Sequence, residues 1–115
     1  MTYKIAEMFT DKPGGRYISD GPFSGEEFRE KELKKLIEQH KDLEEPIIID
    51  FDGGYGYGNS FLEESFGGLV RAGIKKEEVL RIFSFKSEEE PSLVDKVKRY
   101  IREAKKWNIG STLLW

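Results

Sequence analysis

Residues 46–71 read PIIIDFDGGYGYGNSFLEESFGGLVR and decide the fold class. The isoleucines Ile47 to Ile49 form a short apolar run that ends in Asp50, and a glycine-rich loop leads from there to a helical pattern at about Ser60. A strand that is apolar on both faces belongs in the centre of a sheet. A strand that leads through a glycine loop to a helix start is also where α/β proteins place phosphate chemistry or partner contacts.

The rest of the chain predicts alternating strands and helices on either side of this stretch. Apolar spacing and turn residues predict strands at 3–9, 16–19, 47–51 and 79–85, and helices from residue 24 to about residue 40, at 60–71 and at 89–107. Ser24 with Glu27, and Ser60 with Glu63, match the capping-box pattern of helix starts. The order β-β-α-β-α-β-α predicts one α/β domain over residues 1–115, with a mixed central sheet of about four strands and helices packed on it.

Composition excludes several classes of function. The 115 residues are 36% charged but carry a net charge of only −3, without the basic excess of a nucleic-acid binder. The chain has no cysteine, which excludes disulfides, thiolate metal sites and cysteine nucleophiles. No apolar run approaches the roughly 20 residues of a membrane span, and the N-terminus lacks the pattern of a signal peptide. We therefore expect a cytoplasmic protein without membrane, metal or cofactor.

Two carboxylates follow the central strand as Asp50-Phe-Asp52-Gly. This pattern is similar to the first motif of haloacid-dehalogenase-type phosphatases, in which the first aspartate is the nucleophile, the second is a general acid and Mg²⁺ neutralises the phosphate. Those enzymes also need a downstream lysine, a later acidic pair for the metal and a larger core, and no later strand end here carries a paired aspartate. The alternative is that both carboxylates accept hydrogen bonds in the turn.

The loop that follows contains four more candidates for partner or ligand contacts, namely Gly54, Tyr55, Tyr57 and Asn59. No Gly-Lys-Ser/Thr follows, so the loop is not a Walker loop, and it does not match a dinucleotide fingerprint. Its glycines suit backbone with positive φ. The two tyrosines are either buried or part of a recognition surface.

Ser60 is the sharpest candidate at the start of the second helix. As an N-cap its hydroxyl would accept hydrogen bonds from backbone N–H groups. A phosphate on the same oxygen would be stabilised by the helix dipole and would add charge beside Glu63 and Glu64. The two roles, cap and phosphoacceptor, both remain open.

Two charged residues, Arg16 and Asp20, lie in a loop rich in glycine and proline. They either pair with each other, define a partner surface or are ordinary surface residues. His40 is the one histidine of the chain and has no ligand set near it in the sequence, so we assign it no catalytic or metal-binding role.

The stretch from the central strand to Arg71 resembles the STAS domain of anti-sigma-factor antagonists. In that family an apolar strand leads to a helix start whose serine is phosphorylated by a partner kinase. The resemblance places Ser60 at the phosphoacceptor position and Leu62 at the motif leucine. The chain departs from the motif at Asn59, which replaces a serine, and at Phe61, which replaces a glycine.

A closer resemblance is to a family called STAS-like, or DUF4325, whose members carry segments like PGGRYISDGPFSGEEFR at residues 13–29 and SFLEESFGGLVR at residues 60–71. Its members occur with GHKL-type, histidine-kinase-like ATPases. The resemblance implies a non-catalytic partner-switching module that binds such an ATPase or another regulator, with Ser60 as phosphoacceptor.

Other interpretations stay open beside this one. They are a small-ligand or nucleotide-binding module with an anion at the Ser60 helix start, and a Mg²⁺-dependent phosphatase that uses Asp50 and Asp52. An exposed edge strand and the apolar tail at residues 108–115 also leave room for a homodimer.

Overall fold

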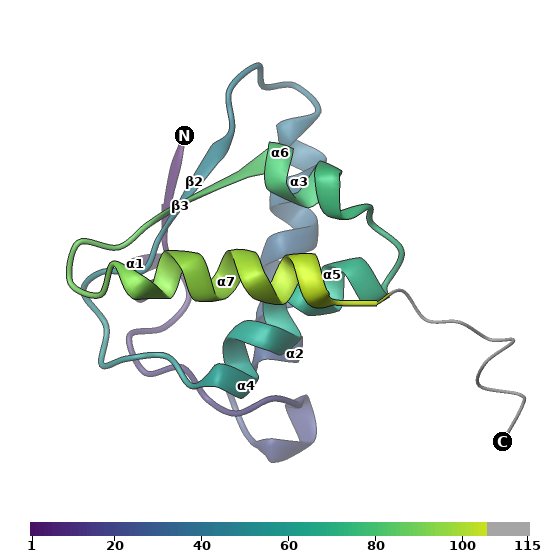
Figure 1. Cartoon of the computed structure of the whole chain (residues 1–115). Helices are drawn as coiled ribbons and strands as arrows, with labels where there is room; N and C mark the ends of the chain where they lie inside the picture. The colour runs from purple at the N-terminus through teal and green to yellow at the C-terminus, as the bar shows by residue number, and fades with distance from the viewer. Residues whose placement is uncertain (106–115) are drawn as a thin grey trace, which may run out of the picture.

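The computed structural model describes residues 1–105 and builds them from three strands and a set of helices (Figure 1). The strands are β1 (Thr2–Lys4), β2 (Ile47–Asp50) and β3 (Phe83–Lys86). The helices are α1 (Ile5–Met8), η1 (Ile18–Asp20), α2 (Gly25–Glu27), η2 (Phe28–Leu33), α3 (Lys34–His40), α4 (Asn59–Leu62), η3 (Glu63–Gly67), α5 (Gly68–Arg71), α6 (Lys76–Ile82) and α7 (Ser92–Glu103). The helix predicted at 89–107 is shorter in the structure, where α7 begins at Ser92 and ends at Glu103. Residues 106–107 of that prediction and the tail at 108–115 lie outside the described residues.

The sheet has the order β1-β2-β3 and is parallel throughout. Tyr3 pairs with Ile49, and Ile49 pairs with Phe85, so these side chains share one face. The central position of β2 confirms the prediction from its apolar run. The prediction of a mixed sheet of about four strands is wrong, because the described residues contain three strands and both pairings are parallel.

The strand predicted at 16–19 does not form. Its place is taken by the 3₁₀ turn η1, in which Asp20 N–H donates to the Tyr17 carbonyl and Tyr17 N–H donates to the Asp20 carboxylate. The carbonyls of Gly15 and Arg16 accept hydrogen bonds from the start of α2. The backbone groups of this segment therefore serve a turn and a helix start, and none remains for a sheet ladder.

Two other predicted strands are partly helical. β1 ends at Lys4, and the chain from Ile5 forms the short helix α1. The segment predicted as a strand at 79–85 contains the end of α6 and then β3. Val79 and Ile82 are both buried and lie three positions apart, which is a helical spacing.

The two long predicted helices are confirmed. α2, η2 and α3 run on without a break, as do α4, η3 and α5. Ser24 caps the first of them, because its Oγ accepts a hydrogen bond from Glu27 N–H at 3.0 Å, and Glu27 in turn accepts from Phe23 N–H. No helix in residues 1–105 has the length and apolar character needed to cross a membrane.

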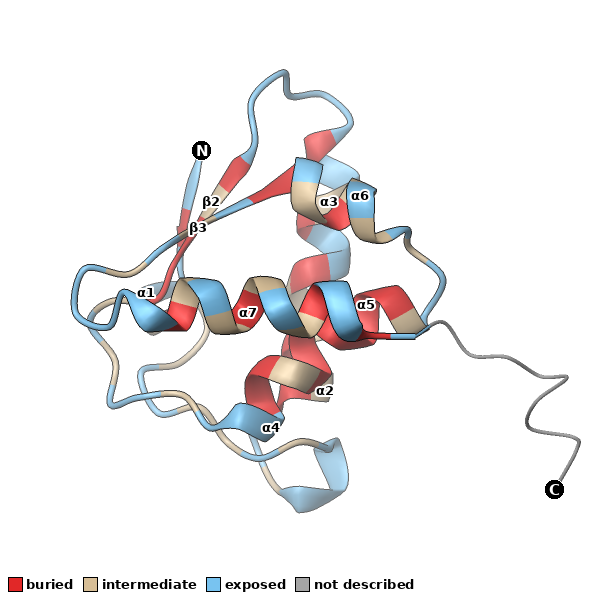
Figure 2. Ribbon diagram, in the orientation of Figure 1, coloured by how far each residue is buried: buried red, intermediate tan, exposed pale blue. Residues whose placement is uncertain are grey.

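The helices bury one face of the sheet, as the colours of Figure 2 show. Tyr3, Ile47, Ile49 and Phe83 are buried on that face. The alternate strand positions are exposed or half-buried, except for Asp50 at the end of β2, which is buried. The buried face and the helices enclose an aromatic core in which Phe66 lies 5.3 Å from Phe85 and 6.2 Å from Phe28, measured between ring centroids.

The start of α2 packs directly on the backbone of the second long helix. A Cβ on Gly25 would lie 2.5 Å from the Phe61 carbonyl oxygen and 3.1 Å from Ser65 Oγ. Ser65 is buried and donates its hydroxyl to the Phe61 carbonyl at 2.7 Å. Gly67 and Gly68 likewise allow close packing of helices, since Gly68 contacts the guanidinium of Arg29. Glycine at these positions therefore allows helices to pack closely against one another.

We predict that Gly25→Ala lowers the free energy of unfolding by about 1–3 kcal/mol, the usual cost of forcing an extra group into packed structure. The added methyl would meet a backbone oxygen that cannot rotate away. Urea denaturation followed by circular dichroism measures the change. Gly58→Ala is the control, because a methyl group there would have no atom within 4 Å beyond its chain neighbours, and only a cap preference below about 1 kcal/mol applies. Equal losses in the two variants would contradict the close-packing argument.

Candidate functional site

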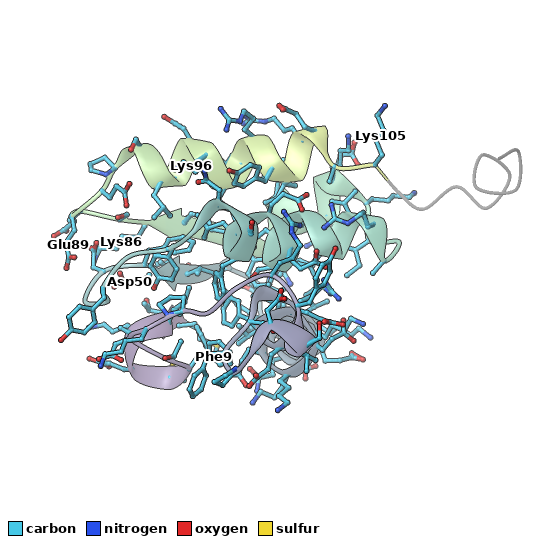
Figure 3. All side chains as sticks on the ribbon, turned by 90° about the horizontal axis from the view of Figure 1, so that it is seen from below. Phe9, Asp50, Lys86, Glu89, Lys96 and Lys105 are labelled. Carbon is cyan, nitrogen blue, oxygen red and sulfur yellow. The ribbon has the colours of Figure 1, made fainter. Side chains whose placement is uncertain are left out.

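The two aspartates that follow β2 have separate structural roles. Asp50 is buried at the end of β2, and its Oδ1 accepts a hydrogen bond from Asp52 N–H at 2.9 Å. Asp52 turns away and accepts from Glu88 N–H at 2.8 Å, from Glu89 N–H at 3.0 Å and from Ser87 Oγ at 3.2 Å. Figure 3 shows Asp50, Lys86 and Glu89 together at one end of the molecule. Asp52 thus ties the loop after β2 to the loop after β3.

The charge of Asp52 is stabilised by these donors. The backbone N–H groups of Glu88 and Glu89 hold the pKa of Asp52 below its ordinary value, with smaller contributions from Ser87 and Lys86. A general acid needs a carboxyl that holds a proton near neutral pH. The environment of Asp52 favours the deprotonated carboxylate instead.

The glycine loop rests on the segment that follows α1. Gly53 has φ +92° and donates its N–H to Glu89 Oε1 at 2.9 Å. Tyr55 N–H donates to the Asp11 carbonyl at 2.9 Å, and a Cβ on Gly54 would lie 3.2 Å from the same oxygen. The Tyr55 side chain is 79% exposed. The loop backbone is therefore held on both sides while Tyr55 projects into solvent.

Tyr57 points the other way. Its ring packs edge-on against Phe51, with 5.3 Å between the ring centroids. The centroid of the Phe61 ring lies 5.9 Å away. Its hydroxyl is buried and has no hydrogen-bond partner among the described residues. Burial, followed by the charges of Asp50 and Asp52, raises the pKa of this hydroxyl. The sequence left open whether the tyrosines are buried or exposed; in the structure the half-buried Tyr57 packs against the core and Tyr55 lies on the surface.

Ser60 is exposed and lies in the first turn of α4, but it is not the N-cap. The helix begins one residue earlier, at Asn59, and Gly58 is the N-cap residue, with φ −71° and ψ 152°. The predicted capping box of Ser60 and Glu63 is therefore wrong, because Gly58 has no side chain to cap with and Glu63 is bound by arginines. The first N–H groups of the helix receive no side-chain cap, while Asn59 and Ser60 both face solvent.

Arg16 and Asp20 do not pair with each other. Asp20 closes the η1 turn through Tyr17 N–H at 2.9 Å. Arg16 reaches across to the second long helix, where its guanidinium donates to Glu63 at 2.6 Å and to Glu64 at 3.1 Å. Tyr17, next to it, is 49% exposed. Arg16 thus fastens the loop at residues 10–24 to the helix that begins at Asn59.

Three arginines surround the two glutamates, and we call this set the arginine–glutamate cluster. Arg71 binds Glu63 through both of its terminal nitrogens, at 2.5 and 2.9 Å. Arg29 donates to the Glu64 carboxylate at 2.5 Å and to the Glu64 carbonyl at 2.9 Å. The Glu64 side chain is only 9% exposed. The cluster lines a hollow of about 340 Å³ together with Tyr17.

No local pattern in the sequence shows that Arg29, Arg71, Glu63 and Glu64 form a cluster. The two segments that carry the family resemblance, 13–29 and 60–71, each end in an arginine, and the second contains a Glu-Glu pair. These residues were the signal that the sequence offered. Arg29, Glu63 and Glu64 lie in the π-helical turns η2 and η3. π-Helical turns are rare in proteins, and those that occur often lie at functional sites.

The arginines of the cluster favour the ionised form of Glu63. Burial by itself would raise the pKa of Glu63, but the hydrogen bonds and charges of Arg71 and Arg16 outweigh it and hold the pKa of Glu63 below its ordinary value. All the arginine donors described above point at carboxylates or carbonyls. The cluster therefore acts as an internal clamp between segments that are far apart in the sequence.

The remaining titratable candidates do not assemble a catalytic set in the part of the chain that the structure describes. His40 is buried at the end of α3 and lines a hollow with Glu78 and Arg81. Among residues 1–105 no three His, Asp or Glu side chains converge in a way that could hold a metal ion. What the arrangement offers is two anchored loops that carry exposed side chains.

The comparisons with known proteins agree with this fold. A family model described as a STAS-like domain of unknown function (DUF4325) matches residues 24–93, which is more than half of the chain. This match confirms the family that the sequence segments indicated. No curated protein and no solved structure matches the chain significantly.

We predict that Asp52→Asn makes the protein less sensitive to acid. The pKa of Asp52 is lower in the folded than in the unfolded chain, so its carboxylate contributes stability above about pH 4, and that contribution is lost as the pH falls through the folded-state pKa. The variant should melt at a lower temperature than wild type at pH 7, with the difference shrinking toward pH 3. Thermal melts across this range measure it. Asp95→Asn is the control, because Asp95 makes no side-chain hydrogen bond to the described residues; a constant difference at all pH values would contradict the prediction.

We predict that Glu64→Ala lowers the free energy of unfolding by about 3 kcal/mol, because it leaves the largely buried guanidinium of Arg29 without its partner. Glu30→Ala is the matched control. Glu30 also pairs with Arg29, but it is 41% exposed, so its loss should cost at most about 1 kcal/mol. Urea denaturation gives both values. Equal, small losses would show that the cluster contributes no more than surface ion pairs do.

Proposed function

The chain belongs to the STAS-like domain family of unknown function (DUF4325), and on this premise we propose that it is a non-catalytic regulatory module that binds a protein partner. The observation that carries the proposal is the gathering of exposed apolar side chains on two anchored loops. We call these loops, residues 10–24 and 53–60, the docking surface.

The docking surface holds most of the large apolar side chains that the described residues expose. Four of the seven lie on it, namely Tyr17, Ile18, Phe23 and Tyr55. The two loops are neighbours, since Tyr55 N–H donates to the Asp11 carbonyl and Lys12 Nζ lies 5.4 Å from the centre of the Tyr55 ring. Exposed apolar and aromatic residues on neighbouring loops are typical of protein interaction sites.

Both loops are held in place before any partner arrives. Arg16 fastens one loop to Glu63 and Glu64, and Asp52 ties the base of the other to residues 87–89. A surface whose backbone is already ordered loses less conformational entropy on binding. This rigidity supports a recognition role for loops that would otherwise be costly to order.

We further propose Ser60 as the phosphoacceptor that controls binding. Its hydroxyl is exposed in the first turn of α4, where the helix dipole and N–H groups without a side-chain cap stabilise negative charge. Phe61 does not cover it, because Phe61 is buried against Phe28 at 5.7 Å between centroids. A phosphate would add negative charge to the edge of an apolar surface and weaken docking by desolvation cost. By family resemblance the partner is a GHKL-type ATPase.

The same open helix start supports a second candidate, a module that binds a small anion such as a nucleotide phosphate. Thermal stabilisation by ATP or GTP that is lost in Ser60→Glu would favour this candidate over phosphorylation. The phosphatase alternative has less support, because three donors already occupy the Asp52 carboxylate.

We predict that a photo-cross-linking amino acid at position 55 captures a partner in the native host, and that the same group at position 43 does not. Leu43 is the control because it is an exposed apolar residue outside the docking surface. Ile18→Ser should reduce capture at position 55 several-fold, and Leu43→Ser should leave it unchanged. Gel shifts and mass spectrometry identify the product. Equal capture from both positions would overturn the docking surface.

Phosphorylation is tested on the same cross-linked product. Ser60→Ala should keep the partner and Ser60→Asp should lose it, with phosphate found on Ser60 of the wild-type protein by mass spectrometry. Retention of the partner by Ser60→Asp would refute control at this serine while leaving the docking surface intact.

A further inference from the structure

Three hollows meet around residues 72–75, the segment that connects α5 to α6 (Figure 1). One of about 630 Å³ lies between the end of α3 and α6, one of about 290 Å³ lies along α3, and one of about 520 Å³ lies at the end of α7. Ile74 lines all three. Because the three hollows share Ile74, we refer to them together as the Ile74 groove.

The floor of the Ile74 groove is apolar and its rim is basic. Ile37 and Ile74 are half-buried, and Leu43 is 38% exposed. The rim carries more basic than acidic side chains in all three hollows together, with Lys34, Lys41, Lys75, Lys76, Lys105 and Arg81 against Glu38, Glu77 and Glu78. None of the exposed apolar residues of the docking surface lines it. The groove is therefore a second surface, independent of the proposed partner site.

The described chain ends inside this groove. Ala104 and Lys105 line its third hollow, beside Val70 and Gly73. Lys76 Nζ donates to the Arg102 carbonyl and so holds the end of α7 against the start of α6. Whatever follows Lys105 in the chain therefore starts at the groove.

The next ten residues read KWNIGSTLLW. Five of them are large and apolar, namely Trp107, Ile109, Leu113, Leu114 and Trp115, and Lys106 is the one charged side chain. Ten extended residues reach about 33 Å. A segment tethered at the edge of a site meets it at an effective concentration in the millimolar range.

We propose that residues 106–115 dock into the Ile74 groove of the same chain. Two observations select this occupant over a separate partner: the covalent attachment at the groove and the apolar composition that matches its floor. Docking would remove Ile74 and Leu43 from water together with the apolar side chains of the segment, and would stabilise the fold by the hydrophobic effect.

The chain supplies its own probe for this proposal, because Trp107 and Trp115 are its only tryptophans. In the full chain their emission should lie at shorter wavelength than in the urea-unfolded chain. Ile74→Asp should shift the emission toward the unfolded position and increase quenching by iodide. Ile18→Asp is the matched control, since Ile18 lies on η1 outside the groove, and should leave the emission unchanged. Circular dichroism checks that each variant folds, and Leu43→Asp at the exposed rim replaces Ile74→Asp if the latter does not.

A contact measurement locates the segment. The chain has no cysteine, so Lys75→Cys accepts a single bimane label, which tryptophan quenches on contact. The same label at Lys86→Cys is the control, because Lys86 and Lys105 lie toward opposite ends of the molecule in Figure 3. We expect bimane at position 75 to be quenched relative to the urea-unfolded protein and to a form with both tryptophans changed to phenylalanine, and bimane at position 86 not to be.

Three results would overturn the proposal. The first is that the tryptophans of the full chain emit at the wavelength of the urea-unfolded chain, and that neither Ile74→Asp nor Leu43→Asp changes this wavelength. The second is quenching at position 86 instead of position 75, which would place the segment at the other end of the sheet. The third is quenching at position 75 that disappears on dilution, which would assign the groove to the segment of a second copy.

Discussion

The carboxylate of Glu64 is the constraint on which the arrangement of the long helices depends. The contact between Gly25 and the Phe61 carbonyl brings the two helices so close that Glu64 is almost excluded from water. A buried carboxylate is costly unless charged or polar donors meet it. Arg29 meets it from the first helix, and Arg16 and Arg71 meet it from the loop and from the far end of its own helix. Helix packing and loop position are thereby coupled through one charge.

A second tie acts at the carboxyl ends of the strands. The carboxylate of Asp52 gathers the backbone N–H groups of Glu88 and Glu89, so the loop after β2 and the loop after β3 hold each other. Asp50 supports the turn from beneath through Asp52 N–H. In a parallel sheet this edge is where loops are free to carry function. Here the aspartates serve to order the loops, and the residues offered to solvent are Tyr55 and Ser60.

The two ends of the molecule therefore have different characters. At one end, ordered loops expose aromatic and apolar side chains, which supports recognition of another protein. At the other end, around Ile74, an apolar floor with a basic rim lies where the described chain stops. The sheet is only three strands wide and is buried on one face in the described residues, so a small domain of this kind has limited apolar area to bury. An additional apolar segment of its own chain would enlarge that area.

Local patterns in the sequence were sufficient for the features that depend on residues within one or two turns of each other. The apolar run at Ile47–Ile49 identified the central strand, Ser24 with Glu27 identified a helix start, and the spacing of Leu93, Val97 and Ile101 identified α7. The strand predicted at 16–19 failed because its backbone partners lie in α2. The strand predicted at 79–85 failed in its first half because the sequence alone does not show that Val79 and Ile82, which are spaced as on one helix face, are both buried.

The candidate site divides in the same way. The sequence by itself indicated the candidate loops, and it determined that the family is STAS-like and that Ser60 stands at a helix start. Only the tertiary structure decided that the half-buried Tyr57 packs against the core while Tyr55 is exposed, that Gly58 rather than Ser60 is the N-cap, and that Arg16 pairs with Glu63 and Glu64 rather than with Asp20. The physical reason is separation: Arg29 and Glu64 are 35 positions apart and Arg16 and Glu64 are 48 apart. Pairings over such distances follow from which helices pack together, and no local pattern of residues specifies that.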